Sequence, residues 1–215
     1  MYYMKNSNKP LLDKVIMEFE YALESIFNDR NTITKEKNTV SKSNLTKGDS
    51  DKSIKVMRVN HMGEVCAQGL YRGQAIVTKD IKIKNKLYKI CSEENNHLQL
   101  CNLRLQELNG KPSLFNPVWY AASFILGAIA GANEKKWKLG FIEETEKQVV
   151  QHLESSIASL PKKDLRSRKF LKEIAVDEEK HRASAKKIGS TDIPENVKKT
   201  MDGLSAIMKK ISFYI

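Results

Sequence analysis

Two of the four histidines in this 215-residue chain follow a glutamate by three residues. One pair is Glu94 and His97, in the stretch EENNH, and the other is Glu178 and His181, in DEEKH. Residues three apart lie on the same face of an α-helix, so each pair can present a carboxylate oxygen and an imidazole nitrogen to one metal ion. Oxygen and imidazole ligands favour iron or manganese over the metals that prefer thiolates.

A lone glutamate precedes each pair by about the length of one helix. Glu64 lies 30 residues before the glutamate of the first pair, and Glu146 lies 32 residues before the glutamate of the second. In an antiparallel helix hairpin, two residues that are equidistant from the turn lie at the same height. The two midpoints fall in a polar break at residues 78–80 and beside Pro161, where turns are expected. Each hairpin therefore brings one lone glutamate level with one Glu-x-x-His pair.

Two such hairpins facing each other place four carboxylates and two imidazoles around one point. This is the ligand set of a ferritin-like di-iron or di-manganese site. Without metal, buried carboxylates this close repel one another and take up protons. Glu143 and Glu144 are alternatives to Glu146, which lies about a turn from Val149 and Val150 and so nearer the buried face. The competing interpretation is that all of these glutamates are ordinary surface carboxylates of helices.

The remaining histidines and the cysteines carry less specific signals. His61 and His152 lie near the expected ligands, so each is either an outer group that orients a carboxylate or an ordinary helical histidine. The cysteines, Cys66, Cys91 and Cys101, are odd in number and form no CxxC motif, which argues against a disulfide framework and fits a reducing compartment. We expect them to be small residues that pack between helices.

Apolar residues recur at helical spacing through most of the chain, which predicts an all-α fold. We expect a ferritin-like four-helix bundle with an apolar crossover helix and extra helices at both ends. The chain divides into an N-terminal amphipathic helix at 1–30, a polar linker at 31–52 and a di-iron domain at 53–215. The predicted helices span residues 10–29, 53–79, 83–109, 135–159, 164–188 and 195–213.

The formal net charge is +11, from 37 Lys and Arg against 26 Asp and Glu. A basic protein can bind an anionic membrane surface or nucleic acid. The basic residues are spread along the chain without an aromatic-interleaved stripe, so no nucleic-acid partner is expected. The N-terminal segment does not have the pattern of a signal peptide, because Asp13, Glu18 and Glu20 interrupt its apolar residues. We therefore expect a protein that stays inside the cell.

Residues 58–74, RVNHMGEVCAQGLYRGQ, resemble the RxxHxGExxAxxxYxGQ signature of the demethoxyubiquinone hydroxylases, which are flavin-independent di-iron enzymes of ubiquinone biosynthesis. The stretches EENNHLQ, LGFIEETEKQVVQHL and DEEKH are similar to other helices of that family. The resemblance runs from about residue 11 to the C-terminus, and the polar linker is its least similar part.

The resemblance implies a ferritin-like fold that binds two iron ions per chain, with O2 as co-substrate. It implies hydroxylation of the ring of a polyprenylated demethoxyubiquinol, with two reducing equivalents. The resemblance favours Glu146 over Glu143 and Glu144 as a ligand. His152 matches a histidine of the family, which favours a role for His152 in orienting a ligand carboxylate. The implied partners are the quinol, the membrane surface on the cytoplasmic side of the cell and other ubiquinone-biosynthesis proteins. The implied metal ligands are Glu64, Glu94, His97, Glu146, Glu178 and His181.

Residues 112–133 are uncharged and mostly apolar, which is long enough to suggest a membrane span. A single span would place the two hairpins on opposite sides of the bilayer and separate the six ligands, so it conflicts with the metal site. The alternatives are a buried core helix and a crossover helix at the bilayer surface that admits a long-tailed quinol. In the second case, the residues expected to enter lipid are Trp119, Tyr120, Phe124, Ile125 and Leu126.

Two other kinds of protein would share part of this pattern of helices and ligand residues. An iron-oxidising or iron-storage protein of the ferritin type would use the same ligands but would not need an apolar crossover. A metal-free helical scaffold at a membrane surface would bind no iron. The sequence favours the hydroxylase.

Overall fold

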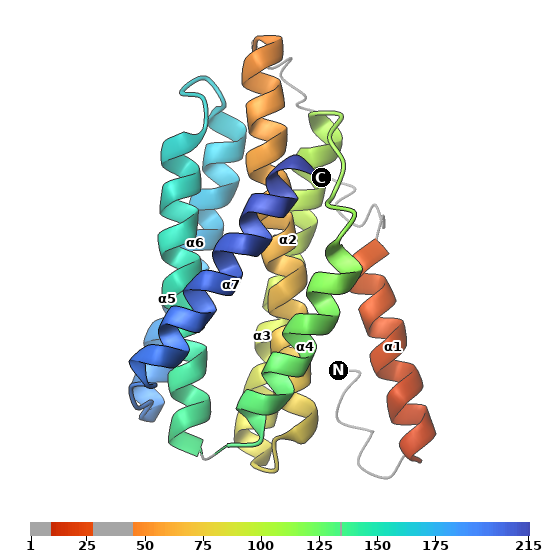
Figure 1. Ribbon diagram of the computed structural model, residues 1–215, viewed down its shortest axis with the longest axis vertical. Coiled ribbons are helices and arrows are strands. Elements are labelled where there is room, and N and C mark those ends of the chain that lie inside the picture. Colours follow the sequence, from red (N-terminus) through yellow and green to blue (C-terminus); the bar gives the residue numbers. More distant parts are fainter. Residues whose placement is uncertain (1–9, 28–44, 134) are drawn as a thin grey trace.

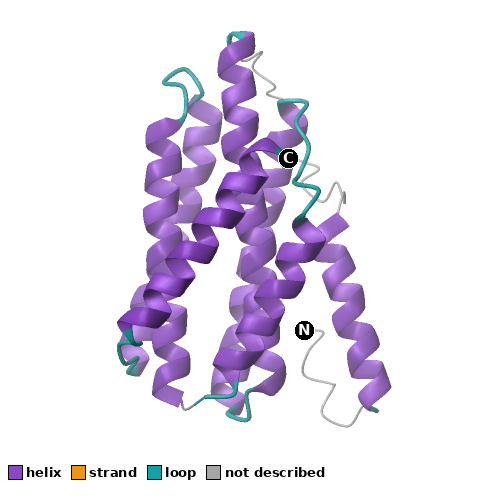
Figure 2. Ribbon diagram, viewed as in Figure 1, coloured by secondary structure: helices purple, strands orange, loops and turns teal. Residues whose placement is uncertain are grey.

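The computed structural model describes residues 10–27, 45–133 and 135–215. This part of the chain forms seven helices and no strand, as the sequence predicts (Figures 1 and 2). The helices are α1 (Leu11–Phe27), α2 (Lys47–Val77), α3 (Ile81–Glu107), α4 (Asn116–Gly131), α5 (Lys135–Ser159), α6 (Leu165–Ile188) and α7 (Glu195–Tyr214).

Helices α2, α3, α5 and α6 form a bundle of two antiparallel hairpins. Thr78–Asp80 separates α2 from α3, and the side chain of Asp80 caps α3 by accepting hydrogen bonds from the backbone N–H groups of its first turn. The second break contains Pro161, and the side chain of Asp164 caps α6 in the same way. Both turns lie where the sequence predicts them. This register is what brings ligand candidates from four helices to one level.

Helix α2 begins earlier than the sequence analysis predicts. Thr46 and Asp49 form a capping box around the start of α2, so residues 47–52 are helical and do not belong to a linker. These first turns are mostly exposed and carry polar residues, so hydrophobic periodicity gave no signal there. The rest of the predicted linker, apart from residues 45 and 46, lies outside the described residues, as do residues 1–9 and 28–30 of the predicted N-terminal segment.

Helix α4 crosses the bundle and links the two hairpins, lying against the outside of α2 (Figure 1). The two helices touch backbone to backbone through glycines on both sides. A Cβ added to Gly73 would lie 1.9 Å from the carbonyl oxygen of Phe124, and one added to Gly127 would lie 1.9 Å from that of Leu70. Only glycine permits this close approach, so these residues set the position of the crossover helix.

Helix α1 is attached to α2 by polar contacts. Arg72 of α2 is buried and donates hydrogen bonds of 2.8 and 2.6 Å to the carboxylate of Glu18. The hydroxyl of Tyr21 donates to the side-chain oxygen of Gln68, and the Arg72 guanidinium lies 4.0 Å from the centre of the Tyr21 ring. The outer side of α1 carries exposed apolar residues, including Val15.

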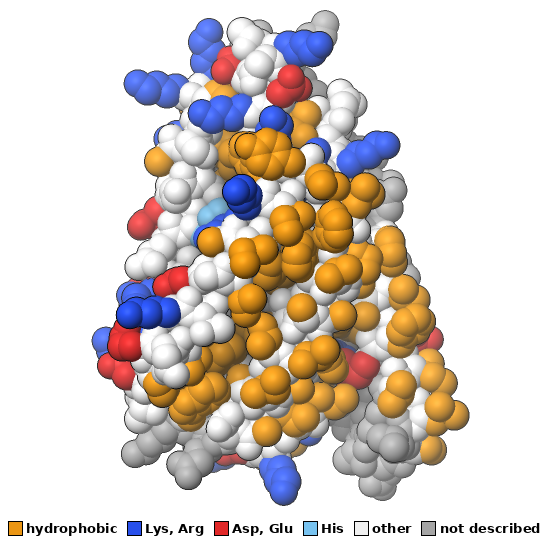
Figure 3. All heavy atoms as spheres, viewed as in Figure 1, with side chains coloured by type: hydrophobic (Ala, Val, Ile, Leu, Met, Phe, Trp, Pro, Cys, Tyr) orange, Lys and Arg blue, Asp and Glu red, His pale blue; other side chains and the backbone are white. Residues whose placement is uncertain are grey.

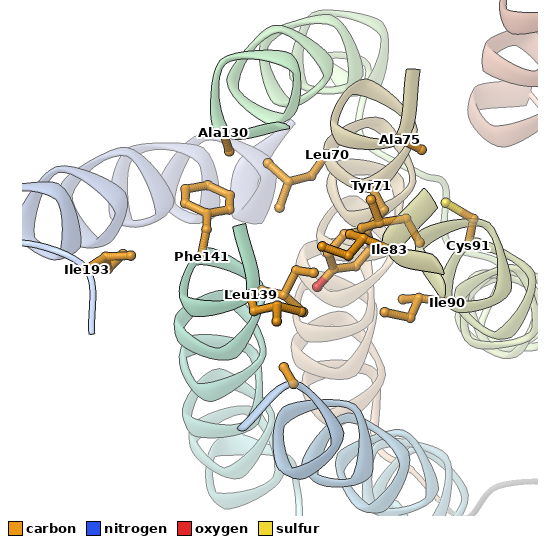
Figure 4. Close-up of a cluster of buried hydrophobic side chains, with 13 residues drawn as sticks. Leu70, Tyr71, Ala75, Ile83, Ile90, Cys91, Ala130, Leu139, Phe141 and Ile193 are labelled. Carbon is orange, nitrogen blue, oxygen red and sulfur yellow. The ribbon is translucent and has the colours of Figure 1, made fainter. Parts of the chain in front are cut away.

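Two clusters of buried apolar side chains fill the two ends of the bundle. One is built around Leu70, Tyr71, Ile90 and Leu139 (Figure 4), and the other includes Met57, Leu105, Leu153 and Leu171. Along each of the four bundle helices, the expected metal ligands lie between residues of these two clusters. The polar site is therefore enclosed in the middle of the bundle by apolar layers. The three cysteines are unpaired, as expected.

Candidate metal centre

The structure brings the six residues singled out in the sequence into one buried group, called here the six-residue cluster (Glu64, Glu94, His97, Glu146, Glu178 and His181). It contains two overlapping sets whose potential ligand atoms all lie within 4.8 Å of one another. The first set is Glu64, Glu94, His97 and Glu178, and the second is Glu94, Glu146, Glu178 and His181. Because Glu94 and Glu178 belong to both sets, the six residues would hold two metal ions in adjacent positions.

The structure also separates Glu146 from its neighbours in sequence. Glu146 is 1% exposed and lies inside the bundle. Glu143 accepts a hydrogen bond from the hydroxyl of Ser190, and Glu144 forms an ion pair of 3.1 Å with Lys147. Of these three glutamates, Glu146 is the one that lies with the other expected ligands.

Both imidazole rings direct Nδ1 toward the carboxylates. Nδ1 of His97 lies 3.0 Å from Glu94 Oε2 and 3.1 Å from Glu178 Oε1. Nδ1 of His181 lies 3.2 Å from Glu178 Oε2 and 3.2 Å from Glu94 Oε1. The ring centres are 6.5 Å apart. Each ring therefore offers the same nitrogen to the space between the two helix hairpins.

The pKa shifts within the six-residue cluster show how protons stabilise its buried carboxylates when no metal ion is bound. Burial raises the pKa of Glu64 and of Glu146 well above the usual range, and the charges of Glu94 and Glu178 add to the effect. Burial alone would lower the pKa of the histidines, but hydrogen bonds to Glu178 and Glu94 outweigh it and raise the pKa of His97 to about 12 and that of His181 to about 10. Protons therefore balance the carboxylate charge.

The residues present fit two divalent metal ions. Oε1 of Glu94 is buried and lies 3.2 Å from His181 Nδ1, on the side of the carboxylate that faces the other expected ligands. Four carboxylates and two imidazoles without a thiolate are the donors that iron and manganese accept. Two divalent ions would also match the charge of four ionised carboxylates.

Tyr71 is a contact of the cluster that the sequence analysis missed. It is buried, and its hydroxyl donates a hydrogen bond to Oε1 of Glu146. The available signal was its spacing on α2, because Tyr71 follows Glu64 by seven residues, which is two helical turns, and so lies on the same face. The contact holds Glu146 in one orientation.

The two other histidines lie outside the six-residue cluster. His61 is buried one turn before Glu64, its Nδ1 lies 3.4 Å from the side-chain nitrogen of Asn116, and burial lowers its pKa to about 4. His152 lies 3.4 Å from the hydroxyl of Ser156, in a hollow between α2, α5 and α7. No described contact links either imidazole to a ligand carboxylate, so the expected outer role of His152 is not confirmed.

The five α4 residues expected to enter lipid do not share one face. Tyr120 is only 5% exposed and packs on the bundle side, so its assignment to lipid was wrong. Phe124 is half-buried beside it, and Trp119 is half-buried and donates a hydrogen bond of 3.1 Å to Ser212. Ile125 and Leu126 are exposed. None of the described helices has the length and apolar character needed to cross a membrane.

Comparison with known proteins gives a consistent result. Residues 51–212 match the family model described as ubiquinone biosynthesis protein COQ7. A 3-demethoxyubiquinol 3-hydroxylase of Polynucleobacter necessarius is 41% identical over 206 residues, which cover 95% of this chain and 99% of that protein. The proteins of the same name from Acinetobacter baylyi and Francisella tularensis subsp. novicida are 42% and 46% identical, covering 95% and 79% of this chain and 97% and 80% of those proteins. The chain belongs to the COQ7 family of ubiquinone biosynthesis proteins, whose ferritin-like fold it shares.

Proposed function

We propose that this protein is a 3-demethoxyubiquinol 3-hydroxylase that uses two iron ions held by the six-residue cluster. The observation that carries the proposal is the buried set of four carboxylates and two imidazoles, in a chain 40–47% identical to hydroxylases of that name. In the reaction, one atom of O2 is inserted into a ring C–H bond to give C–OH. The other atom leaves as water with two electrons and two protons from a reductant. When bound, iron supplies the redox chemistry that activates O2.

The protein's own residues account for the setting of this reaction. The four carboxylates would balance the positive charge of two bound metal ions, and the two imidazoles would complete the ligand set without adding negative charge. Tyr71 keeps one carboxylate in place through its hydrogen bond to Glu146. The apolar clusters at the two ends of the bundle keep bulk water from reaching the site along the bundle axis.

A quinol with a polyprenyl tail resides in a membrane, so the protein must reach it there. Figure 3 shows hydrophobic side chains gathered over the face formed by α4, α7 and α1. The exposed residues of this apolar face include Val118, Ile125 and Ile129 on α4, Leu204 and Ile207 on α7, and Val15, Phe19 and Leu23 on α1. Together with a net charge of +11, this face supports docking on an anionic bilayer surface. The cytoplasmic side of the cell membrane remains a prediction.

The test is hydroxylation of a short-tailed demethoxyubiquinol by the iron-loaded protein with 18O2 and a chemical reductant. The expected product carries one 18O atom on the ring, detected by mass spectrometry, and the Glu178→Ala variant should form none. Rapid oxidation of ferrous iron with storage of ferric iron and no ring product would contradict the proposal and favour an iron-storage protein.

A further inference from the structure

The outer nitrogens of both cluster histidines contact carboxylates outside the cluster. Nε2 of His181 lies 2.9 Å from Oε2 of Glu93, and Nε2 of His97 lies 3.5 Å from Oδ2 of Asp177. Each contact crosses the bundle, because Glu93 and His97 are on α3 whereas Asp177 and His181 are on α6. The two helices thus exchange equivalent contacts.

The two carboxylates hold equivalent places in the sequence. Glu93 directly precedes Glu94, and Asp177 directly precedes Glu178, so each Glu-x-x-His pair is preceded by an acid. Consecutive residues of a helix are rotated by about 100° about its axis. Glu93 and Asp177 therefore do not face the metal site with the ligand glutamates but face the opposite helix. Both acids line a cleft of about 940 Å³ between α3 and α6, whose wall also includes His97 and His181.

A lysine holds the second oxygen of each of these carboxylates. Oε1 of Glu93 lies 3.3 Å from Lys89, and Oδ1 of Asp177 lies 2.7 Å from Lys180. In both cases one oxygen faces a lysine of the same helix and the other faces a histidine of the opposite helix. The lysine orients the carboxylate, so that its free oxygen is presented to the imidazole.

We propose that Glu93 and Asp177 are positioning residues for the metal centre, which accept the Nε2–H of His181 and His97 and so keep Nδ1 of each ring available to a metal ion. A neutral imidazole carries one N–H, and an acceptor at Nε2 selects the tautomer whose Nδ1 has a free lone pair. Outer carboxylates of this kind also fix the ring orientation and make the ligand more basic. The inference rests on the proposed metal site.

The two residues act on different metal positions. His97 belongs to the set with Glu64, and His181 belongs to the set with Glu146. Loss of Asp177 therefore weakens binding at the first position, and loss of Glu93 weakens binding at the second. The effect of Glu93 is the larger, because 2.9 Å is a normal hydrogen-bond length whereas 3.5 Å is long.

The experiment is an anaerobic titration of the full chain with ferrous iron against a competing chromophoric chelator. The variants are Glu93→Leu and Asp177→Leu, with Glu93→Gln and Asp177→Asn as conservative forms whose amide oxygen still accepts a hydrogen bond. The control is Glu173→Leu, since Glu173 lines the same cleft but pairs with Lys169. The near-infrared circular dichroism of bound ferrous iron reports ligand orientation, and melting without metal reports folding.

Each leucine variant should bind one of two ferrous ions about 10–100-fold more weakly, with a changed ferrous spectrum. The amide variants should recover most of the affinity, and Glu173→Leu should match the wild type. Unchanged affinity in both leucine variants, or an equal loss in Glu173→Leu, would overturn the inference. A wild type that binds no ferrous iron would instead refute the proposed metal site.

Discussion

At the scale of single residues, the six-residue cluster is stabilised by protons when no metal is present. The carboxyl groups of Glu64 and Glu146 have raised pKa values, and so do the imidazoles of His97 and His181. Metal ions must displace these protons in order to bind. Metal loading and the pH dependence of stability are therefore linked.

We expect the metal-free protein to lose stability as the pH rises from about 7 to about 9. The pKa values of His97 and His181 in the folded chain are about 12 and about 10, whereas unfolded imidazoles release their protons near pH 6.5. The folded state therefore binds more protons, and the free energy of unfolding falls as the pH rises. The slope is about 1.4 kcal/mol per pH unit for each proton retained.

The measurement is urea unfolding of chelator-treated protein across this pH range. Burial lowers the pKa of His61 and His152 to about 4, which acts in the opposite direction, but only below about pH 6.5. The iron-loaded protein is the control, and its slope should be smaller because metal has replaced the protons. Stability of the metal-free protein that is flat or rises over this range would contradict the account.

The sequence predicted all six members of the cluster. Residue type and spacing, repeated in two hairpins, indicated five of them, and the family resemblance favoured Glu146 over Glu143 and Glu144. It did not predict Tyr71, Glu93 or Asp177 as contacts of the cluster. An acid or a tyrosine on a helix has many available partners, and its actual partner is defined only when the opposite helix is placed. The repeated acid before each ligand glutamate was present in the sequence, but its meaning depends on the distance between α3 and α6.

At the scale of elements, the four bundle helices were predicted to within a few residues at most ends because polar breaks, capping residues and Pro161 mark their turns. The orientation of α4 on the bundle was not predicted from the sequence. This helix is apolar on all sides, so its sequence does not show which face packs on the bundle. The orientation depends on Gly69 and Gly73 of α2, which meet the α4 backbone.

We expect Gly73→Ala to lower the free energy of unfolding by about 1–3 kcal/mol, because α2 and α4 must separate to accommodate the methyl group. Its Cβ would lie 1.9 Å from the carbonyl oxygen of Phe124. The matched control is Gly63→Ala on the same helix, where a Cβ meets nothing within 4 Å. This control should gain about 0.5–1 kcal/mol from the higher helix propensity of alanine. Urea unfolding measures the free energy of unfolding of both variants. Equal changes in Gly73→Ala and Gly63→Ala would contradict the close packing of α2 against α4.

At the scale of the whole molecule, the apolar face over α4, α7 and α1 contrasts with the polar cleft between α3 and α6. The exposed apolar side chains on this face come from three helices that are far apart in sequence. Only the assembled fold shows that they form one surface. An apolar surface of this extent indicates an interaction site, which fits a substrate that is held in a bilayer.

We expect the protein to float with vesicles that contain anionic lipid, and the double variant Ile125→Glu with Ile129→Glu to bind them at least about tenfold more weakly. Burial of one isoleucine side chain contributes about 1.5–3 kcal/mol, and about 1.4 kcal/mol corresponds to a factor of ten. The control is Val176→Glu, since Val176 is 57% exposed on α6, away from the apolar face. Flotation unaffected by the double variant, or equally reduced in the control, would argue against this docking surface.

The metal content of the protein tests the central claim most directly. Protein purified without chelator and reconstituted anaerobically with ferrous iron would be analysed by mass spectrometry of the metal, beside Glu178→Ala and the neighbouring Glu179→Ala. Glu179 is a matched control, because it faces outward and pairs with Arg182. We expect about two irons per chain in the wild type and in Glu179→Ala, with most of the iron lost in Glu178→Ala. Little iron in the reconstituted wild type, or equal iron in Glu178→Ala, would contradict the account.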